Sequence, residues 1–428
     1  MKRIILPLLM CLFPALPAHG DEGELRERIE TLSKELEKLK HEMEDMNSRT
    51  EAIADQQQAA NQATAPGTQE NASSQVSIWG YGEINYNRPT SQSRASKADL
   101  RRAVFGFGYR FDEDTRFTSE FELEHAIVSA DDDGEFEAEQ FYIDHNLTSS
   151  TRAKLGLFLI PMGFLNESHE PTRYYGVERN FVETAIIPTT WREGGVGLYG
   201  DTRLGLSWDI GVTTGFYLGN WDPTSTDGQQ SPLGSIHQEL QNAKAKDLSG
   251  YLALNYRGIP GWVAGASVFT GKASQGDPSV SLASGSQVTL WEAHTRWTPG
   301  NFDLSALYAM GTISDTADLN ATFVGNPTLI PKEFWGGYLQ AAYSFPLGGS
   351  RSLAPFARYA RFNTGSKYAS LPAGLNVDSL PTETVWTTGV NFYLNPSVVF
   401  KADYQHFSGD YPGDVNQNRF DLGLGLEF

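Results

Sequence analysis

The chain of 428 residues contains a single cysteine, Cys11, and that residue lies within the first apolar run. If the run is removed as an export signal, disulfides, cysteine-bound metals and thiol chemistry are excluded. The rest of the sequence has no apolar stretch of the ~20 residues that a membrane-spanning helix needs, and mean hydropathy is only −0.37. Basic residues are also few, 33 against 52 acids, for a net charge of −19. This acidic balance argues against a nucleic-acid partner.

The first twenty residues have the pattern of a secretory signal peptide. Lys2 and Arg3 precede an apolar run over 4–16, and the small residues Ala18 and Gly20 come just before Asp21. A charged start, a short apolar centre and a small-residue cleavage site are typical of export signals. We therefore expect residues 1–20 to be removed.

Residues 21–58 carry apolar side chains in alternating steps of three and four, with no Pro or Gly after Glu24. Such a narrow stripe predicts an α-helical coiled coil, although a lone amphipathic helix would show the same stripe. The pattern does not decide between dimer and trimer. The residues expected at the helix contact are Leu25, Ile29, Leu32, Leu36, Leu39, Met43 and Met46. Residues 59–75, rich in Gln, Ala, Asn and Thr, predict a flexible linker.

Residues 76–428 alternate apolar and polar side chains in segment after segment. The last nine, Phe420 to Phe428, place Phe or Leu on every even number and Asp, Gly or Glu on every odd one. Successive strand residues point to opposite faces, so each segment has one apolar face. The predicted strands are sixteen, at 76–87, 99–110, 115–129, 135–147, 153–160, 194–200, 204–218, 248–257, 262–271, 287–297, 301–311, 333–344, 353–363, 382–394, 398–408 and 418–428.

The connections between these segments alternate in length. Those after even-numbered strands are short and turn-like, and those after odd-numbered strands are mostly long. This asymmetry is typical of outer-membrane barrels, whose short turns face the periplasm. We expect an all-β fold, a 16-stranded antiparallel transmembrane β-barrel over 76–428, with the coiled coil in the periplasm.

Charged residues recur on the face opposite the apolar one, so we expect a water-filled interior. The connection 161–193 is long, charged and aromatic, and it is expected either to fold inward and narrow the pore or to pack as a lid over the mouth. The candidate residues of the pore wall and constriction are Arg102, Arg110, Arg116, Glu120, Glu122, Glu124, Asp144, Glu167, His169, Glu170, Arg173, Glu178, Arg179, Arg192 and Arg296.

Four segments, 99–103, 120–123, 157–163 and 353–359, resemble the phosphate-selective porin O and P family of bacterial trimeric porins. The resemblance implies a homotrimer, a third loop folded inward, and passage of ions or small solutes. Phosphate selectivity is not expected to carry over, because recognition by repeated charge-assisted bonds needs a ladder of bases along the wall. From Val76 onward acids instead exceed bases, and no basic ladder is visible.

The predicted function is therefore a passive porin in the outer membrane, in contact with lipid and lipopolysaccharide, without enzymatic activity, cofactor or metal. The acid excess favours cations slightly. An alternative is a barrel on a coiled-coil stalk that serves as a structural tether or adhesin. A barrel enzyme would need an outward-facing Ser with a His partner, and the histidines have simpler explanations.

Overall fold

The computed structural model describes residues 75–428 except 92, 127–133, 324, 373–376 and 410–417. The chain divides into two compact units, 1–74 and 75–428. The predicted signal peptide, the coiled coil with its contact residues and almost all of the predicted linker therefore lie outside the described residues.

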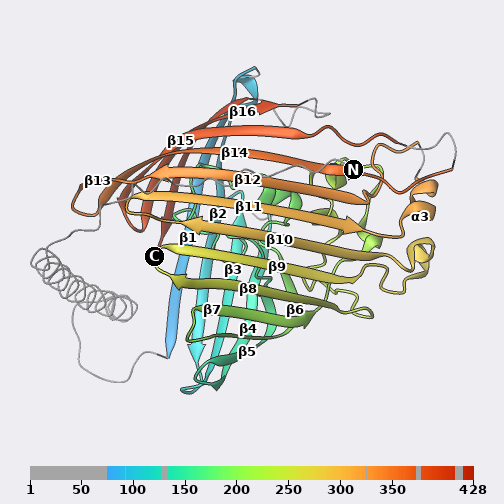
Figure 1. The fold of residues 1–428 in the computed structure, drawn as a ribbon, viewed down its shortest axis with the longest axis horizontal. Helices are drawn as coiled ribbons and strands as arrows, with labels where there is room; N and C mark the ends of the chain where they lie inside the picture. The colour runs from blue at the N-terminus through green and yellow to red at the C-terminus, as the bar shows by residue number, and fades with distance from the viewer. Residues whose placement is uncertain (1–74, 92, 127–133, 324, 373–376, 410–417) are drawn as a thin grey trace, which may run out of the picture. The chain divides into compact units, whose positions relative to one another are not determined.

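The second unit is built almost entirely from β-strands (Figure 1). The strands are β1 (Val76–Pro89), β2 (Lys97–Arg110), β3 (Thr115–Glu124), β4 (Phe136–Thr148), β5 (Thr151–Leu159), β6 (Arg192–Asp201), β7 (Leu206–Thr213), β8 (Ser249–Ile259), β9 (Trp262–Lys272), β10 (Gln287–Trp297), β11 (Phe302–Ile313), β12 (Glu333–Tyr343), β13 (Phe345–Gly348), β14 (Arg351–Lys367), β15 (Glu383–Asn395), β16 (Val398–Ser408) and β17 (Arg419–Glu427).

The sheet closes on itself. Consecutive strands pair antiparallel along the chain, and β1 pairs with both β2 and β17. β12 and β13 both pair with β14, on either side of Ser344, so they occupy one position in the sheet. The barrel therefore has the predicted sixteen strand positions, and closure leaves no unpaired edge.

Two predicted strands are longer than the observed ones. The strand predicted over 204–218 is only β7, because the chain leaves the sheet at Thr214 and enters a 3-10 turn at Leu218. The strand predicted to run to residue 129 ends at Glu124, and His125 and Ala126 take positive φ angles of 53° and 65°. Left-handed backbone of this kind cannot continue a strand.

The few helical turns all lie in connections between strands. They are η1 (Ser93–Ala95), η2 (Val182–Ile186), η3 (Leu218–Asn220), α2 (Asp227–Gln230), η4 (Gly234–Ile236), η5 (Pro278–Ala283) and α3 (Ala317–Thr322). Among the described residues, no helix is long and apolar enough to cross a membrane.

The predicted asymmetry of the connections is present. Those after even-numbered strands up to β10, and those after β13 and β15, are short turns such as 149–150 and 396–397. The connections 160–191 and 214–248 are the longest of those at the other end. The start of β1 and the end of β17 both lie at the short-turn end, as their register with β2 and β16 requires.

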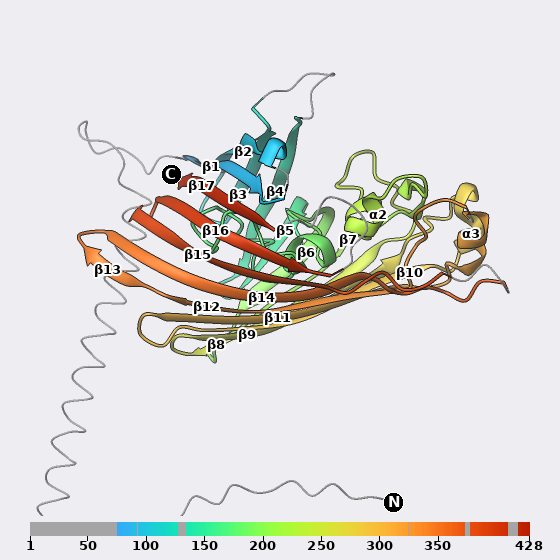
Figure 2. The ribbon, with the colours of Figure 1, turned by 90° about the horizontal axis from the view of Figure 1, so that it is seen from above.

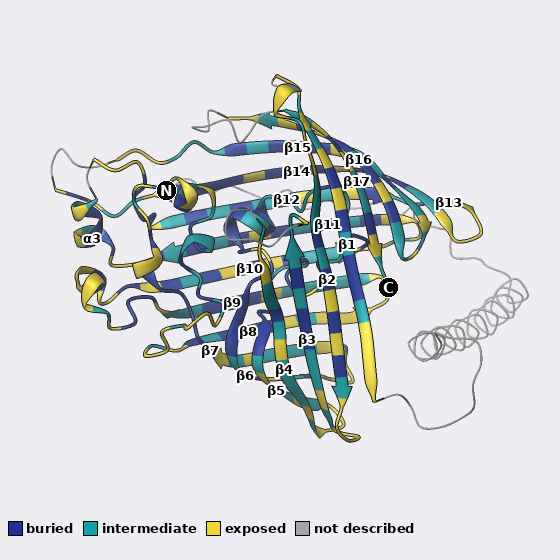
Figure 3. Ribbon diagram, turned by 180° about the vertical axis from the view of Figure 1, so that it is seen from behind, coloured by how far each residue is buried: buried dark blue, intermediate teal, exposed yellow. Residues whose placement is uncertain are grey.

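Exposed and buried residues alternate as bands along the strands (Figure 3), and the two faces of the sheet differ in chemistry. Outward positions are apolar and exposed, for example Leu155, Leu339 and Trp386. Inward positions include the buried Lys401 and Asp403. The alternation along each strand thus separates an apolar exterior from a polar interior.

Part of the inner wall is apolar, which the sequence analysis did not predict. Inward residues of β9 to β15, including Phe269, Leu290 and Phe334, form a cluster with side chains of the long connections. Trp191 packs at the centre of this cluster, with its ring 4.5 Å from that of Phe269. The interior is therefore divided between a packed apolar region and a charged region.

Candidate functional site

The connection 160–191, here called the inner loop, leaves β5 and returns to β6 after crossing the inner face of the barrel. Its ends continue the β5–β6 pairing, since the Ile160 amide donates to the Trp191 carbonyl at 3.0 Å. In Figure 2 this green segment lies between the blue and cyan strands on one side and the orange and red strands on the other.

The middle of the inner loop is bonded to strands on the opposite wall. The Tyr174 hydroxyl donates to Glu83 of β1 at 2.7 Å, and the Val177 amide donates to Asp403 of β16 at 2.6 Å. Asn391 of β15 donates to the Tyr174 carbonyl at 3.0 Å. Burial, followed by the charge of Glu83, raises the pKa of Tyr174, so its hydroxyl stays protonated and donates.

Two glycines of β17 make room for this contact. A Cβ on Gly425 would lie 2.5 Å from the Cβ of Pro171, and one on Gly423 would lie 3.2 Å from Val177. The alternate glycines of the terminal segment are therefore the inward positions on which the inner loop rests. A side chain at Gly425 would have to displace the loop.

Glu183 holds the inner loop in its shape. Its buried carboxylate accepts hydrogen bonds from the Phe164 amide at 2.6 Å, the Leu165 amide at 2.8 Å, Asn180 Nδ2 at 2.7 Å and the Tyr338 hydroxyl at 3.0 Å. Burial raises the pKa of Glu183, although these hydrogen bonds oppose the rise. The carboxylate joins both halves of the loop to β12.

Apolar side chains fasten the same segment to the wall. Val182 and Ile186 of η2 are fully buried beside Phe334 and Phe362. A Cβ on Gly336 of β12 would come within 3.1 Å of both η2 side chains. Burial of apolar area, at roughly 25 cal/mol per Å², therefore adds to the polar contacts in keeping the loop inside.

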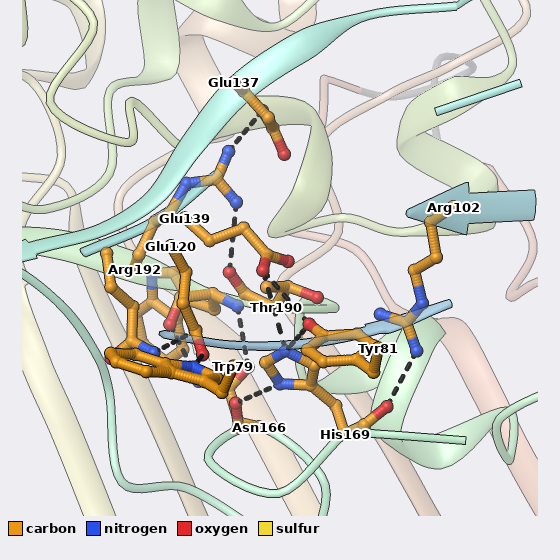
Figure 4. Close-up of polar contacts among 12 residues, drawn as sticks. Trp79, Tyr81, Arg102, Glu120, Glu137, Glu139, Asn166, His169, Thr190 and Arg192 are labelled. Atoms are coloured by element: carbon orange, nitrogen blue, oxygen red, sulfur yellow. Dashed lines mark hydrogen bonds and ion pairs between the residues drawn. The ribbon is translucent and has the colours of Figure 1, made fainter. Parts of the chain in front are cut away.

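A charged chamber of about 360 Å³ lies between the inner loop, the connection after β7 and strands β1 to β4. Seven glutamates and five arginines line it. Arg192 Nη2 contacts Glu137 and lies 3.1 Å from Glu239, while its Nη1 donates to the Thr190 carbonyl at 3.2 Å (Figure 4). Arg102 donates to Glu83 at 2.9 Å and to the His169 carbonyl at 2.7 Å.

His237 and Glu239 complete the chamber wall from the connection after β7, with 2.8 Å between Nδ1 and Oε1. Burial opposes charge on His237, but Glu239 outweighs this effect and raises the pKa of His237. Burial likewise opposes charge on Glu239, and the hydrogen bond from His237 and the charge of Arg192 lower its pKa. Both shifts favour the charged forms of the pair.

The predicted pore residues fall into two groups. Most of them gather at the inner loop or the chamber and adjoining wall: Arg102, Glu120, Glu122, Glu124, Glu167, His169, Glu170, Arg173, Glu178, Arg179 and Arg192. Arg110 and Arg116 are exposed at the short turn between β2 and β3, and Asp144 lies near the other end of β4 from the chamber. Arg296 pairs with Asp303 across β10 and β11, outside the chamber but next to the inner loop, since Asp303 accepts from the Tyr175 hydroxyl at 3.1 Å.

Several residues of the site were missed. They are Tyr81, Glu83, Glu137, Glu139, Tyr174, His237 and Glu239. Tyr174 could have been found, because it lies in the predicted loop 161–193. No sequence signal pairs Glu239 with Arg192, which is 47 positions away.

No protein-family model matches the chain. A protein of Aquifex aeolicus (strain VF5), described as an uncharacterized protein, is 31% identical over 338 residues, which cover 77% of this chain and 75% of that one. The chain belongs to the same family as this protein.

Solved porin structures share the fold of this chain. The structure titled "Salmonella typhi OmpF complex with Daunomycin" matches with a TM-score of 0.59 at 15% identity, over 82% of this chain and 97% of that chain. The anion-selective porin from Comamonas acidovorans matches with a TM-score of 0.50 at 12% identity, over 82% and 99%. At these identities the likeness shows a common fold, the closed sixteen-stranded antiparallel barrel.

Proposed function

We propose that this protein is an outer-membrane porin, a passive diffusion channel for ions and small polar solutes without enzymatic activity. One observation carries the proposal: a closed barrel presents apolar side chains outward while it encloses a charged chamber. A closed barrel satisfies every backbone hydrogen bond, as lipid requires. A sixteen-stranded barrel is also too wide for wall side chains to fill, which supports a watery interior.

The inner loop is proposed to narrow this passage. Its bonds to β1, β12, β15 and β16 support a position across the lumen. Permeant ions would then pass the chamber, where a few fixed charges set selectivity. Seven glutamates against five arginines favour a modest preference for cations. We do not propose phosphate selectivity from the resemblance to phosphate-selective porins, because glutamates outnumber arginines in the chamber and the arginines do not form a continuous basic ladder.

The rest of the predicted organisation belongs to the same proposal. Residues 1–20 would direct export, and residues 21–58 would form a coiled coil in the periplasm. A homotrimer in contact with lipid and lipopolysaccharide would be the assembled form. Solved porins share the barrel fold, which supports the outer-membrane location of residues 76–428 within this proposal.

The proposal is tested by electrical recording in planar bilayers. Purified protein is expected to give discrete conductance steps. Across a potassium chloride gradient, its reversal potential should have the sign that indicates a mild preference for cations. Phosphate, dicarboxylates and sugars added in competition should reduce the current little. A silent protein that still bound cell wall would favour the tether, and strong block by phosphate would contradict the assigned selectivity.

A further inference from the structure

Three side chains with metal-binding atoms meet on the lumen wall beneath the inner loop. They are Glu120 of β3, Glu139 of β4 and His169 of the loop, and their ligand atoms all lie within 4.8 Å of one another. All three are buried, with exposed fractions of 8%, 0% and 3%. Figure 4 shows them turned toward one another around Tyr81.

A β-bulge brings the second carboxylate into this cluster. Glu120 is in register with Gln140, but the next pair is Phe121 with Ala138, so Glu139 is the extra residue of β4. A bulge redirects a side chain, and bulges are common next to functional sites. In a regular strand residues 139 and 140 would point to opposite faces, so only one of them would point inward. The bulge lets Glu139 also point inward, beside Glu120.

His169 is oriented as metal-binding histidines are. Its Nδ1 lies 2.9 Å from the Asn166 carbonyl, which can only accept, so Nδ1 carries a proton and Nε2 is the nitrogen that faces the two carboxylates. Asn166 is itself fixed, since its Nδ2 donates to the carbonyls of Ile160 and Trp191, each at 2.7 Å. Such outer partners hold a ligand ring in place.

Glu139 supplies a second, independent observation. Its side chain is fully buried, yet among the residues that the structure describes none donates a hydrogen bond to its Oε1. Leaving a charged oxygen unsatisfied in a buried site is costly. The guanidinium of Arg102 is directed to Glu83 and the His169 carbonyl. A cation would satisfy Oε1 of Glu139.

The other carboxylate is already positioned. Glu120 Oε1 accepts from Trp79 Nε1 at 2.6 Å, and Oε2 accepts from Gln140. A carboxylate has about four acceptor positions, so both oxygens retain lone pairs for a metal. Tyr81, whose hydroxyl lies 2.6 Å from His169 Nε2 and 3.1 Å from Glu139, occupies the centre of the cluster.

We propose that Glu120, Glu139 and His169 bind one divalent transition-metal ion, with Zn²⁺ the best match, and that the ion ties the inner loop to β3 and β4. One imidazole and two carboxylates suit zinc and its neighbours in the first transition row. Calcium and magnesium instead take oxygen ligands, six or more for calcium. Glu122, which lies beside Glu139, also lines the charged chamber.

The test uses the full-length protein folded in detergent and freed of metal by a chelator. Equilibrium dialysis against Zn²⁺ is expected to give one ion per chain, and Co²⁺ to give a visible absorption band. Substitution of a residue that only supports a metal ligand typically weakens metal binding by about 10–100-fold. Glu139→Gln and His169→Gln replace ligands themselves, so each should weaken zinc binding by more than this. His294→Gln is the matched control, because His294 is a buried lumen histidine paired with Glu292 at 2.8 Å.

A second measurement needs no variant. Zinc should slow hydrogen exchange of the amides in 164–170, because it joins this part of the loop to the wall. A heat-dependent shift on a gel verifies that each variant folds. The proposal fails if the native protein binds no zinc, if Ca²⁺ binds equally well, if exchange is unchanged, or if His294→Gln lowers binding equally. None of these readouts uses conductance, so a failure of the metal-site proposal can be distinguished from a failure of the proposed channel function.

Discussion

At the scale of single residues, the chamber is held by ion pairs whose strength depends on pH. A raised His237 pKa means that its stabilisation is complete below the ordinary value of 6.5 and is lost as pH rises through the folded value. A lowered Glu239 pKa means that its stabilisation is complete above the ordinary 4.5 and is lost as pH falls through the folded value. The two contributions to stability are therefore both complete only between pH 4.5 and pH 6.5, the ordinary pKa values of the two groups.

We expect the connection 214–248 to be best ordered between about pH 4.5 and 6.5. Hydrogen-exchange protection of its amides, corrected for the intrinsic rates, measures this. His237→Gln should remove the loss on the alkaline side and keep the acid side, because Glu239 still faces Arg192. Glu193 also faces His237 and favours its charge. His294→Gln should change neither side, and an alkaline loss that survives in His237→Gln would refute the assignment.

At the scale of elements, the strands were predictable because each carries its own signal. Alternation over ten residues needs no distant partner, and it placed Arg102, Glu120 and Glu122 on the inner face. The apolar inner wall was missed because the sequence pattern assigns the apolar residues of each strand to the outer face. Phe269 and Phe334 are apolar and lie on the inner face, and the pattern alone does not distinguish them from outward residues. These wall positions are apolar because side chains of the inner loop and of the other long connections pack against them.

The partners of the inner loop could not be predicted for a related reason. His169 and Tyr81 are 88 positions apart, and Tyr174 and Asn391 are 217 apart. A loop without periodicity gives no register from which such pairs follow. The bulge at Glu139 is equally hidden, since it changes the pairing of β4 without changing its composition.

Deleting 165–187 and joining the ends with a short Gly-Ser linker should raise single-channel conductance and weaken ion selectivity. The deletion removes Pro171, Val177 and Glu183, the contacts that keep the loop across the lumen. Recording in planar bilayers measures both effects. Deletion of α3 (Ala317–Thr322), another turn at the long-loop end, is the control and should leave conductance unchanged. Equal conductance in the inner-loop deletion would place that loop outside the current path.

At the scale of the whole molecule, stability depends on closure. Register pairs join β1 to β17 from Tyr81 with Glu427 to Pro89 with Arg419. The backbone of Phe428 then exchanges hydrogen bonds with Gly80, at 2.8 and 3.0 Å. These bonds lie between the two ends of the barrel sequence, so no folded sheet is complete until β17 is in place.

Removing 419–428 should therefore prevent folding into lipid. β1 and β16 would each expose a row of backbone groups, and every unsatisfied group in hydrocarbon costs several kcal/mol. We expect the truncated protein to show no heat-dependent gel shift and no conductance. Leu422→Ala is the control, because its exposed outward side chain changes while the backbone pairing with β1 and β16 stays. A truncated protein that still shifted on heating and conducted would show that fifteen strand positions close without β17, and the requirement for closure through β17 would be wrong.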